Sequence, residues 1–200
     1  MHHQIQKENY EIRLRPVAME DAQFIVSLRN SDHAMGSIHD TSASLQRQQE
    51  WLRSYYERDG DIYFIVETLC GIPIGTYGLY EFEDNTAELG RWIMLPEVPA
   101  ALPSAMIALG IAFDHLGLDA IRGTVVSTNR TVRSFNRKFG FHETGILRDH
   151  CMIQGQKIDL VTTRLDRLHW PKIQAKHETL ARYAGQRIRA WADSVRQLKV

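Results

Sequence analysis

The sequence predicts a single α/β domain, with a mixed, mostly antiparallel sheet of about six to seven strands and helices on both faces. Three observations predict this fold class. Segments in which polar and apolar residues alternate recur along the chain. Amphipathic or wholly apolar segments of helical length separate them. Their order is strand, two helices, three strands, helix, strand, helix and two strands, which is the order of a layered α/β domain.

The first two elements are a strand and a helix. Residues 10–17 alternate polar with apolar side chains and predict a half-buried strand. Residues 19–30 predict a helix, because Ala22, Ile25 and Leu28 share one face. A polar stretch, residues 31–40, follows this helix.

The next segment predicts a second helix and three strands. The inner face of the helix carries Trp51, Leu52 and Tyr55. Its cap is Ser42 or Ser44, and neither serine has Glu or Gln three residues later, so its start stays open between them. Residues 61–69, 72–82 and 86–94 predict an antiparallel meander.

The second half of the domain begins with residues 103–116, which are apolar nearly all round and predict a buried helix. Pro103 suits its first helical position and Gly117 its end. A short buried strand at 120–127 follows, and then a helix capped by Asn129 and ended by Gly140. Strands at 142–153 and 157–165 form a hairpin through Gln154-Gly155.

The two ends of the chain lie outside this domain, which we expect over residues 9–167. Residues 1–8 are expected to be a flexible N-terminus. Residues 168–200 predict a C-terminal amphipathic helix whose apolar positions recur at helical spacing. That helix either packs back on the domain or forms a homodimer contact, and we slightly favour the dimer.

Composition excludes several classes of function. The chain has 24 basic and 24 acidic residues, so no basic field favours nucleic acid or an anionic membrane. No apolar run is long enough to span a membrane and no signal peptide is evident, so we expect a cytoplasmic protein. The two cysteines, Cys70 and Cys151, lack metal-ligand spacing, and we expect free thiols and no metal.

Four motifs occur in a characteristic order and spacing: Glu88-Leu89-Gly90-Arg91-Trp92-Ile93, residues 112–118 (AFDHLGL), Ser127-Thr128-Asn129, and Lys138-Phe139-Gly140-Phe141. Together they resemble the GNAT N-acetyltransferases over roughly residues 9–167. Within that superfamily the chain looks closest to the ribosomal-protein and nucleotide-amino-sugar N-acetyltransferases. The second group is suggested by Leu28-Arg29-Asn30, residues 49–52 (QEWL), residues 147–150 (LRDH) and residues 155–159 (GQKID).

The resemblance implies acetyl-CoA as co-substrate and direct transfer to a primary amine. It assigns the pantetheine arm to the backbone of Ile93, Met94 and Leu95, with the Leu95 N–H as an oxyanion donor. It assigns the pyrophosphate to a loop before the buried helix, where a helix N-terminus attracts anions. The family's loop glycines are absent here, so the expected donors are Ala100, Ala101, Leu102 and Ser104.

Two asparagines and an arginine complete the expected donor site. Asn129 caps its helix, and by resemblance also contacts the pantetheine arm. Asn136 stands where many relatives have a tyrosine that protonates the departing thiolate. An amide cannot supply that proton, so a water would have to do so. Arg137, on the same helix, is a candidate for the CoA phosphates, and a solvated position is its alternative.

Glu88 is the leading candidate for the general base, and a purely structural carboxylate is its equal alternative. His150 is the next candidate, because histidine titrates near working pH. His39 is a weaker one.

The acceptor side is expected at the loop between the first two helices and at the last hairpin. The candidate binding residues are Arg29, Asn30, His39, Trp51, Glu88 and His150. Arginine suits a nucleotide diphosphate, so a nucleotide-linked amino sugar is the preferred small-molecule acceptor. Transfer to a protein N-terminus or to a polyamine is the first alternative. A binding module of this fold without catalysis is another, motivated by the missing glycines and tyrosine.

Overall fold

A computed structural model of the chain describes residues 3–32, 34 and 42–198, and its strands form one mixed sheet. The strands are β1 (Lys7–Asn9), β2 (Ile12–Pro16), β3 (Asp61–Thr68), β4 (Pro73–Glu83), β5 (Thr86–Met94), β6 (Ala120–Val126), β7 (His142–Ile153) and β8 (Gln156–Asp166). Their order across the sheet is β1-β2-β3-β4-β5-β6-β8-β7. Neighbouring strands are antiparallel except β5 and β6, which run parallel.

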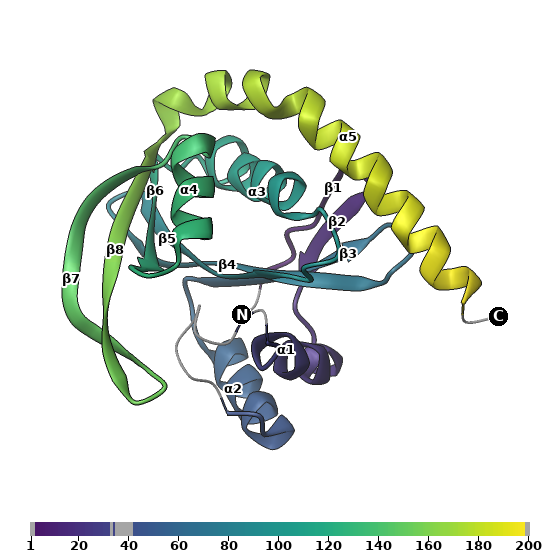
Figure 1. Ribbon diagram of the computed structural model, residues 1–200, viewed down its shortest axis with the longest axis horizontal. Coiled ribbons are helices and arrows are strands. Elements are labelled where there is room, and N and C mark those ends of the chain that lie inside the picture. Colours follow the sequence, from purple (N-terminus) through teal and green to yellow (C-terminus); the bar gives the residue numbers. More distant parts are fainter. Residues whose placement is uncertain (1–2, 33, 35–41, 199–200) are drawn as a thin grey trace.

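Helices cover both faces of the sheet (Figure 1). The elements are η1 (Met19–Asp21), α1 (Ala22–Arg29), α2 (Leu45–Glu57), α3 (Ala101–Gly110), its π-helical continuation η2 (Ile111–His115), α4 (Arg130–Phe139), η3 (Arg167–His169) and α5 (Trp170–Gln197). Helices α1 and α2 lie on one face, and α3, α4 and α5 lie on the other. The predicted fold class is confirmed. The sheet has eight strands rather than six or seven, because β1 precedes the predicted series of elements.

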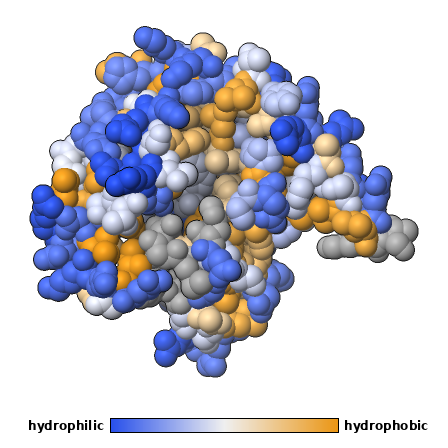
Figure 2. Space-filling view, viewed as in Figure 1, coloured by the Kyte–Doolittle hydropathy of each residue, from blue (hydrophilic) through white to orange (hydrophobic). Residues whose placement is uncertain are grey.

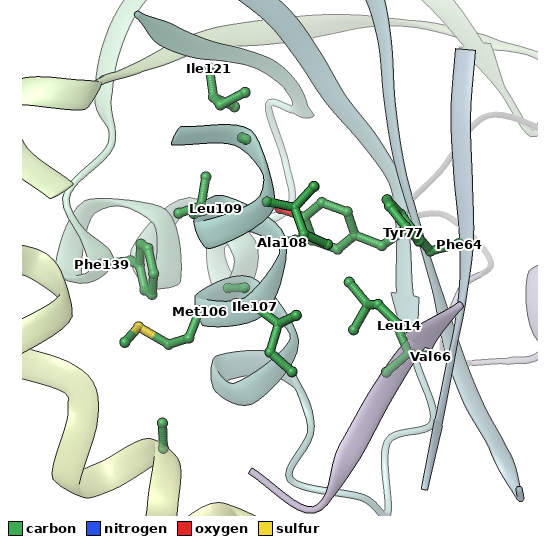
Figure 3. Close-up of a cluster of buried hydrophobic side chains, with 14 of the residues drawn as sticks. Leu14, Phe64, Val66, Tyr77, Met106, Ile107, Ala108, Leu109, Ile121 and Phe139 are labelled. Atoms are coloured by element: carbon green, nitrogen blue, oxygen red, sulfur yellow. The ribbon is translucent and has the colours of Figure 1, made fainter. Parts of the chain in front are cut away.

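The main core lies between the sheet and α3. Phe64 and Tyr77 from the sheet face Ala108 and its neighbours on α3 (Figure 3), and all three are fully buried. Seven successive residues of α3, Pro103 to Leu109, are buried, which confirms the predicted all-round apolar helix. A smaller core joins α1, α2 and the opposite face of the sheet.

The structure determines where α2 and α3 begin. Ser44 caps α2, because its Oγ accepts a hydrogen bond from the Arg47 N–H at 3.3 Å. Helix α3 begins at Ala101, two residues earlier than predicted, so Pro103 lies in the first turn. A proline is accommodated there because first-turn N–H groups lack intrahelical partners.

The predicted flexible N-terminus is wrong in part, because Lys7–Asn9 form β1 and pair with β2. The strand predicted over 10–17 is also shorter, because Tyr10 and Glu11 form the turn of this hairpin with φ angles of 51° and 62°. Alternation of side chains does not reveal a turn in which two non-glycine residues adopt the left-handed conformation.

Helix α5 packs against its own domain. Ala181, Gly185 and Ile188 are buried, and a Cβ on Gly185 would lie 2.6 Å from the Tyr10 carbonyl oxygen. Leu180 and Tyr183 remain exposed. Among the described residues, no helix is both long and apolar enough to cross a membrane.

Candidate functional site

The two parallel strands of the sheet pair for only part of their length. The β5–β6 ladder joins Thr86–Leu89 to 120–123, and the last matched pair is Leu89 with Gly123. Both strands then continue, β5 to Met94 and β6 to Val126. A cleft of about 1040 Å³ is lined by both strands beyond this point and by residues of α1, α2 and α4. Figure 2 shows this face of the molecule hollowed near its centre.

A β-bulge in β5 shapes the cleft. Gly78 pairs with Gly90 and Thr76 pairs with Ile93, so β5 carries one more residue than β4 between these pairs. Arg91 lies in this bulge with a φ of 50°. An extra residue reverses the alternation of side chains that follow it. Gly90 and Arg91 therefore both face the α1–α2 side of the sheet.

In a regular strand, alternation with a period of two predicts that Glu88 and Trp92 share one face, and the bulge makes that prediction wrong. The Trp92 indole contacts Phe135 of α4 and donates from Nε1 to the Ser104 hydroxyl of α3, at 3.2 Å. It thus lies on the α3–α4 face, opposite to Glu88.

Glu88 lies where the two strands separate. Its Oε1 accepts a hydrogen bond of 3.0 Å from the hydroxyl of Thr124, which is the first β6 residue beyond the ladder and lines the cleft. Burial raises the pKa of Glu88, and the hydrogen bond from Thr124 opposes this shift. A carboxylate with a raised pKa beside a cleft can serve as a general base.

Asn136 forms part of the cleft wall on the α4 side. Its side chain is buried, and its Oδ1 has no hydrogen-bond partner among the described residues. Buried polar atoms are nearly always hydrogen-bonded, so an N–H donor from a bound molecule would complete this site. Asn129 also lines the cleft and caps α4, because its Oδ1 accepts from the Val132 N–H at 3.1 Å.

The predicted pyrophosphate donors are only partly available. The Ala100 N–H donates to the Val98 carbonyl at 2.7 Å, and the Ser104 N–H donates to the Ala100 carbonyl. The Ser104 hydroxyl is fully buried and bonded to Ala101 and Trp92, so its predicted phosphate contact is wrong. The N–H groups of Ala101 and Leu102 remain as first-turn donors of α3.

The predicted oxyanion donor is also wrong. The Leu95 N–H donates to the Ile74 carbonyl at 2.8 Å and so continues the ladder with β4. Successive residues of a strand turn their N–H groups to opposite sides. Met94 pairs with Gly75 and its N–H is therefore directed toward the gap beside β6. Ile93, Met94 and Leu95 all line the cleft, as the resemblance implied.

The α1–α2 side of the cleft, where the acceptor was predicted to bind, is rich in arginine. Arg29 of α1, Arg58 after α2 and Arg91 of β5 line it, and no aspartate or glutamate does so among the described lining residues. Burial lowers the pKa of Arg29, Tyr63 opposes this shift, and the neighbouring Arg91 adds to it. Asp61 pairs with Arg58 and Arg91 and so offsets part of this charge, and a bound anion would offset more of it.

Arg91 is held by an acid and three aromatic rings. Its guanidinium makes a bidentate ion pair with Asp61, with Nη2 at 2.9 Å from Oδ2. It also lies 5.0 Å from the Trp51 ring, 5.1 Å from Tyr63 and 4.4 Å from Tyr80.

Two glycines make room for this arrangement. A Cβ at Gly78 would lie 3.2 Å from the Arg91 Cδ, and a Cβ at Gly90 would overlap with the Tyr80 hydroxyl. Burial raises the pKa of Tyr80 to about 12, and Glu88 adds to the shift, so the hydroxyl stays protonated at neutral pH.

Of the other predicted acceptor residues, Trp51 belongs to the described cleft lining and Asn30 does not. Trp51 lines the cleft, but Tyr55 stacks beside its ring and Arg58 and Arg91 lie over it, so it is enclosed rather than free to stack on a base. The Asn30 amide donates to the Val26 carbonyl at 2.9 Å at the end of α1.

The remaining candidates lie away from the cleft or outside the description. His150 and Arg137 are exposed, and neither belongs to the described cleft lining. His39 lies outside the described residues. In the described part of the chain, no cluster of three His, Cys, Asp or Glu side chains could hold a metal ion.

Sequence reasoning missed Asp61, Tyr80, Arg91 and Thr124. One signal was available, because Gly78 and Gly90 interrupt two strands, and glycine within a strand often marks a bulge or a close approach. The glycines alone do not indicate which side chain fills the space beside each of them.

Comparison with known proteins agrees with this geometry. A family model described as the acetyltransferase (GNAT) domain matches residues 11–142. A search of curated proteins gave no match.

Solved structures with this fold cover most of the chain. One is described as apo FdhC, a nucleotide-linked sugar GNAT; it is 25% identical, the alignment covers 91% of this chain and 99% of that one, and the TM-score is 0.74. A GCN5-related N-acetyltransferase from Brucella melitensis is 20% identical, with 90% and 86% covered and a TM-score of 0.77. Spermidine N-acetyltransferase from Vibrio cholerae, in complex with CoA and spermine, is 23% identical, with 82% and 99% covered and a TM-score of 0.74.

Proposed function

Because this chain belongs to the GNAT acetyltransferase family, and is therefore an acetyl-CoA-dependent N-acetyltransferase, we propose that its acceptor is the primary amine of a nucleotide-linked amino sugar. The transfer is direct, from the thioester to the amine, with no acyl-enzyme. Cys151 lines the cleft, but burial raises the pKa of its thiol, which disfavours the thiolate needed for an acyl-enzyme.

The observation that carries this proposal is the charge of the acceptor end. Three arginines and no described carboxylate line it. Asp61, outside the described lining, pairs with Arg58 and Arg91, and the positive charge that remains suits an anionic acceptor and opposes a cationic polyamine. The fold alone is shared with a nucleotide-linked sugar GNAT and with a spermidine N-acetyltransferase. The side chains of the cleft therefore favour the first of these two acceptor classes.

The chain's own groups divide the chemistry among them. Glu88 takes the proton of the ammonium group, so that a neutral amine can attack. The Met94 N–H stabilises the negative oxygen that develops at the thioester carbonyl. Asn136 accepts an N–H hydrogen bond from the pantetheine arm. Water protonates the thiolate, because an amide has no acidic proton to give.

Steady-state acetylation of three amines tests the proposed acceptor. The amines are a UDP-linked 4-amino sugar, a peptide with a free N-terminus, and spermidine. We expect the nucleotide-linked sugar to have the highest kcat/KM. A higher kcat/KM for spermidine or for the peptide would overturn the proposal in favour of that class.

Replacing Arg29 with methionine tests the anion site directly. Arg29→Met keeps a long side chain but removes the charge, so we expect KM for the nucleotide-linked sugar to rise by about tenfold or more, since hydrogen bonds to charged groups contribute about 1.5–3 kcal/mol. The KM for acetyl-CoA should stay unchanged. Arg53→Met, at an exposed position of α2, is the matched control. Equal KM values for the two variants would remove Arg29 from the site.

Replacing Asn136 with leucine separates the donor site from the fold. Because Asn136 Oδ1 is buried without a partner, Asn136→Leu should leave the free protein as stable or more stable in thermal unfolding. The same change should weaken acetyl-CoA binding by about fivefold in calorimetry, because the lost hydrogen bond contributes about 1 kcal/mol. Parallel loss of stability and affinity would show a structural role only.

We also propose a cytoplasmic location, supported by two cysteines that are both free. The homodimer through α5 remains one alternative, supported by exposed Leu180 and Tyr183 on that helix. Light scattering of the purified chain decides between monomer and dimer.

A further inference from the structure

Glu88 is half-buried and lies beside the cleft. It does not belong to the described cleft lining, whereas Thr124 does. Thr124 is exposed and is the first β6 residue past the end of the β5–β6 ladder. Its hydroxyl spans the point where the strands separate and donates to Glu88 Oε1 at 3.0 Å. This hydrogen bond gives the carboxylate a direct polar connection to the cleft through Thr124.

We propose that Thr124 is a further catalytic residue, whose hydroxyl aims the Glu88 carboxylate and conducts the proton from the acceptor ammonium to it. This inference rests on the proposed function. In the transfer, the ammonium N–H bond breaks and its proton passes to Thr124 Oγ1. At the same time, the hydroxyl proton of Thr124 passes to Glu88 Oε1. Threonine ends unchanged, Glu88 ends protonated, and the amine is left neutral with its electron pair free.

Charged and aromatic side chains from β4, β6 and β8 lie around Glu88. From β4, Tyr80 is paired with Glu88 in the sheet register, and the charge of Glu81 raises the pKa of Glu88. From β6, Arg122 lowers it by charge, and its Nη2 donates to the Glu81 carbonyl at 2.9 Å. Arg164 of β8 pairs with Arg122 in the register and is bound to Asp166. Among these groups, the hydroxyl of Thr124 both contacts Glu88 and reaches the cleft.

Two substitutions at Thr124 test the relay. Thr124→Val has nearly the same shape but no hydroxyl, so we expect kcat to fall by about tenfold to 100-fold with the acceptor KM little changed, since positioned proton transfer contributes about 10²–10⁴-fold. Thr124→Ser keeps the hydroxyl and should retain most of the activity. Thr144→Val is the matched control, because Thr144 is exposed on β7 and its hydroxyl bonds only Thr162 in the described structure. Wild-type kcat in Thr124→Val would overturn the proposal.

A second readout needs no acceptor. Titration of the Glu88 carboxyl by NMR should show a higher pKa in Thr124→Val than in wild type or Thr124→Ser, because the lost hydrogen bond favours the ionised form. An unchanged pKa in Thr124→Val would overturn the positioning role. If the wild type acetylated none of the amines tested, the proposed function would fail, and this titration would still decide whether Thr124 aims the carboxylate.

Discussion

Replacing Glu88 with glutamine is expected to lower kcat by about 100-fold or more, because a positioned general base contributes about 10²–10⁴-fold. The KM values should change little, since the amide keeps the shape and can still meet Thr124. In the wild type, the rate should fall on the acid side as Glu88 becomes protonated. Burial raises its pKa, so this limb should lie above the pH range of an exposed glutamate. Initial rates between about pH 5 and 9 measure both effects.

The free energy of unfolding distinguishes a loss of catalysis in Glu88→Gln from a loss of folded protein. A raised pKa means that the ionised carboxylate is less favourable in the folded than in the unfolded chain, so its cost appears as pH rises through that pKa. Glu88→Gln should therefore keep or increase the free energy of unfolding at neutral pH. Glu83→Gln, an exposed carboxylate at the end of β4, is the matched control. Full activity and an unchanged acid limb in Glu88→Gln would assign Glu88 a structural role.

Replacing Arg91 with methionine is expected to cost about 3 kcal/mol of unfolding free energy, because it leaves the buried Asp61 carboxylate with only the more distant Arg58, at 3.8 Å. The side chains of Asp61 and Arg91 are 7% and 17% exposed, so water screens the pair poorly. The same change removes a cation stacked against Trp51, Tyr63 and Tyr80. Urea-induced unfolding at constant pH measures the loss.

Two further variants identify its cause. The double variant Arg91→Met/Asp61→Asn should recover part of the stability, because no unpaired carboxylate remains buried. Arg182→Met breaks an exposed pair with Glu178 and should cost less than about 1 kcal/mol. A loss in Arg91→Met as small as that in Arg182→Met would show that the ion pair contributes little.

Periodicity predicted the elements that bury apolar faces. The meander of β3, β4 and β5 and the wholly apolar α3 were found from sequence because burial dictates their patterns. The turn at Tyr10 and Glu11 and the bulge at Arg91 were not found. Both depend on positive φ angles in non-glycine residues, which no apolar pattern records.

The same limit applies to the candidate site. Arg29, Asn136 and the strand residues 93–95 were placed at the cleft by their motifs, and the structure brings them together there. Individual hydrogen-bond donors were predicted less accurately. The Leu95 N–H donates to β4, whereas the N–H of Met94, one residue earlier, is directed toward the gap beside β6. Ser104 was predicted as a phosphate donor, but its hydroxyl is bonded to Trp92, which the bulge places on the α3–α4 face of the sheet.

Calorimetric titration of acetyl-CoA into the purified chain tests the proposed mechanism most directly, because every proposed step requires the donor in the β5–β6 cleft. We predict saturable binding at one site per chain, weakened by Asn136→Leu, although the loop before α3 lacks the family's glycines. No saturable heat over a wide concentration range would contradict it, and would leave a GNAT fold that has lost its donor.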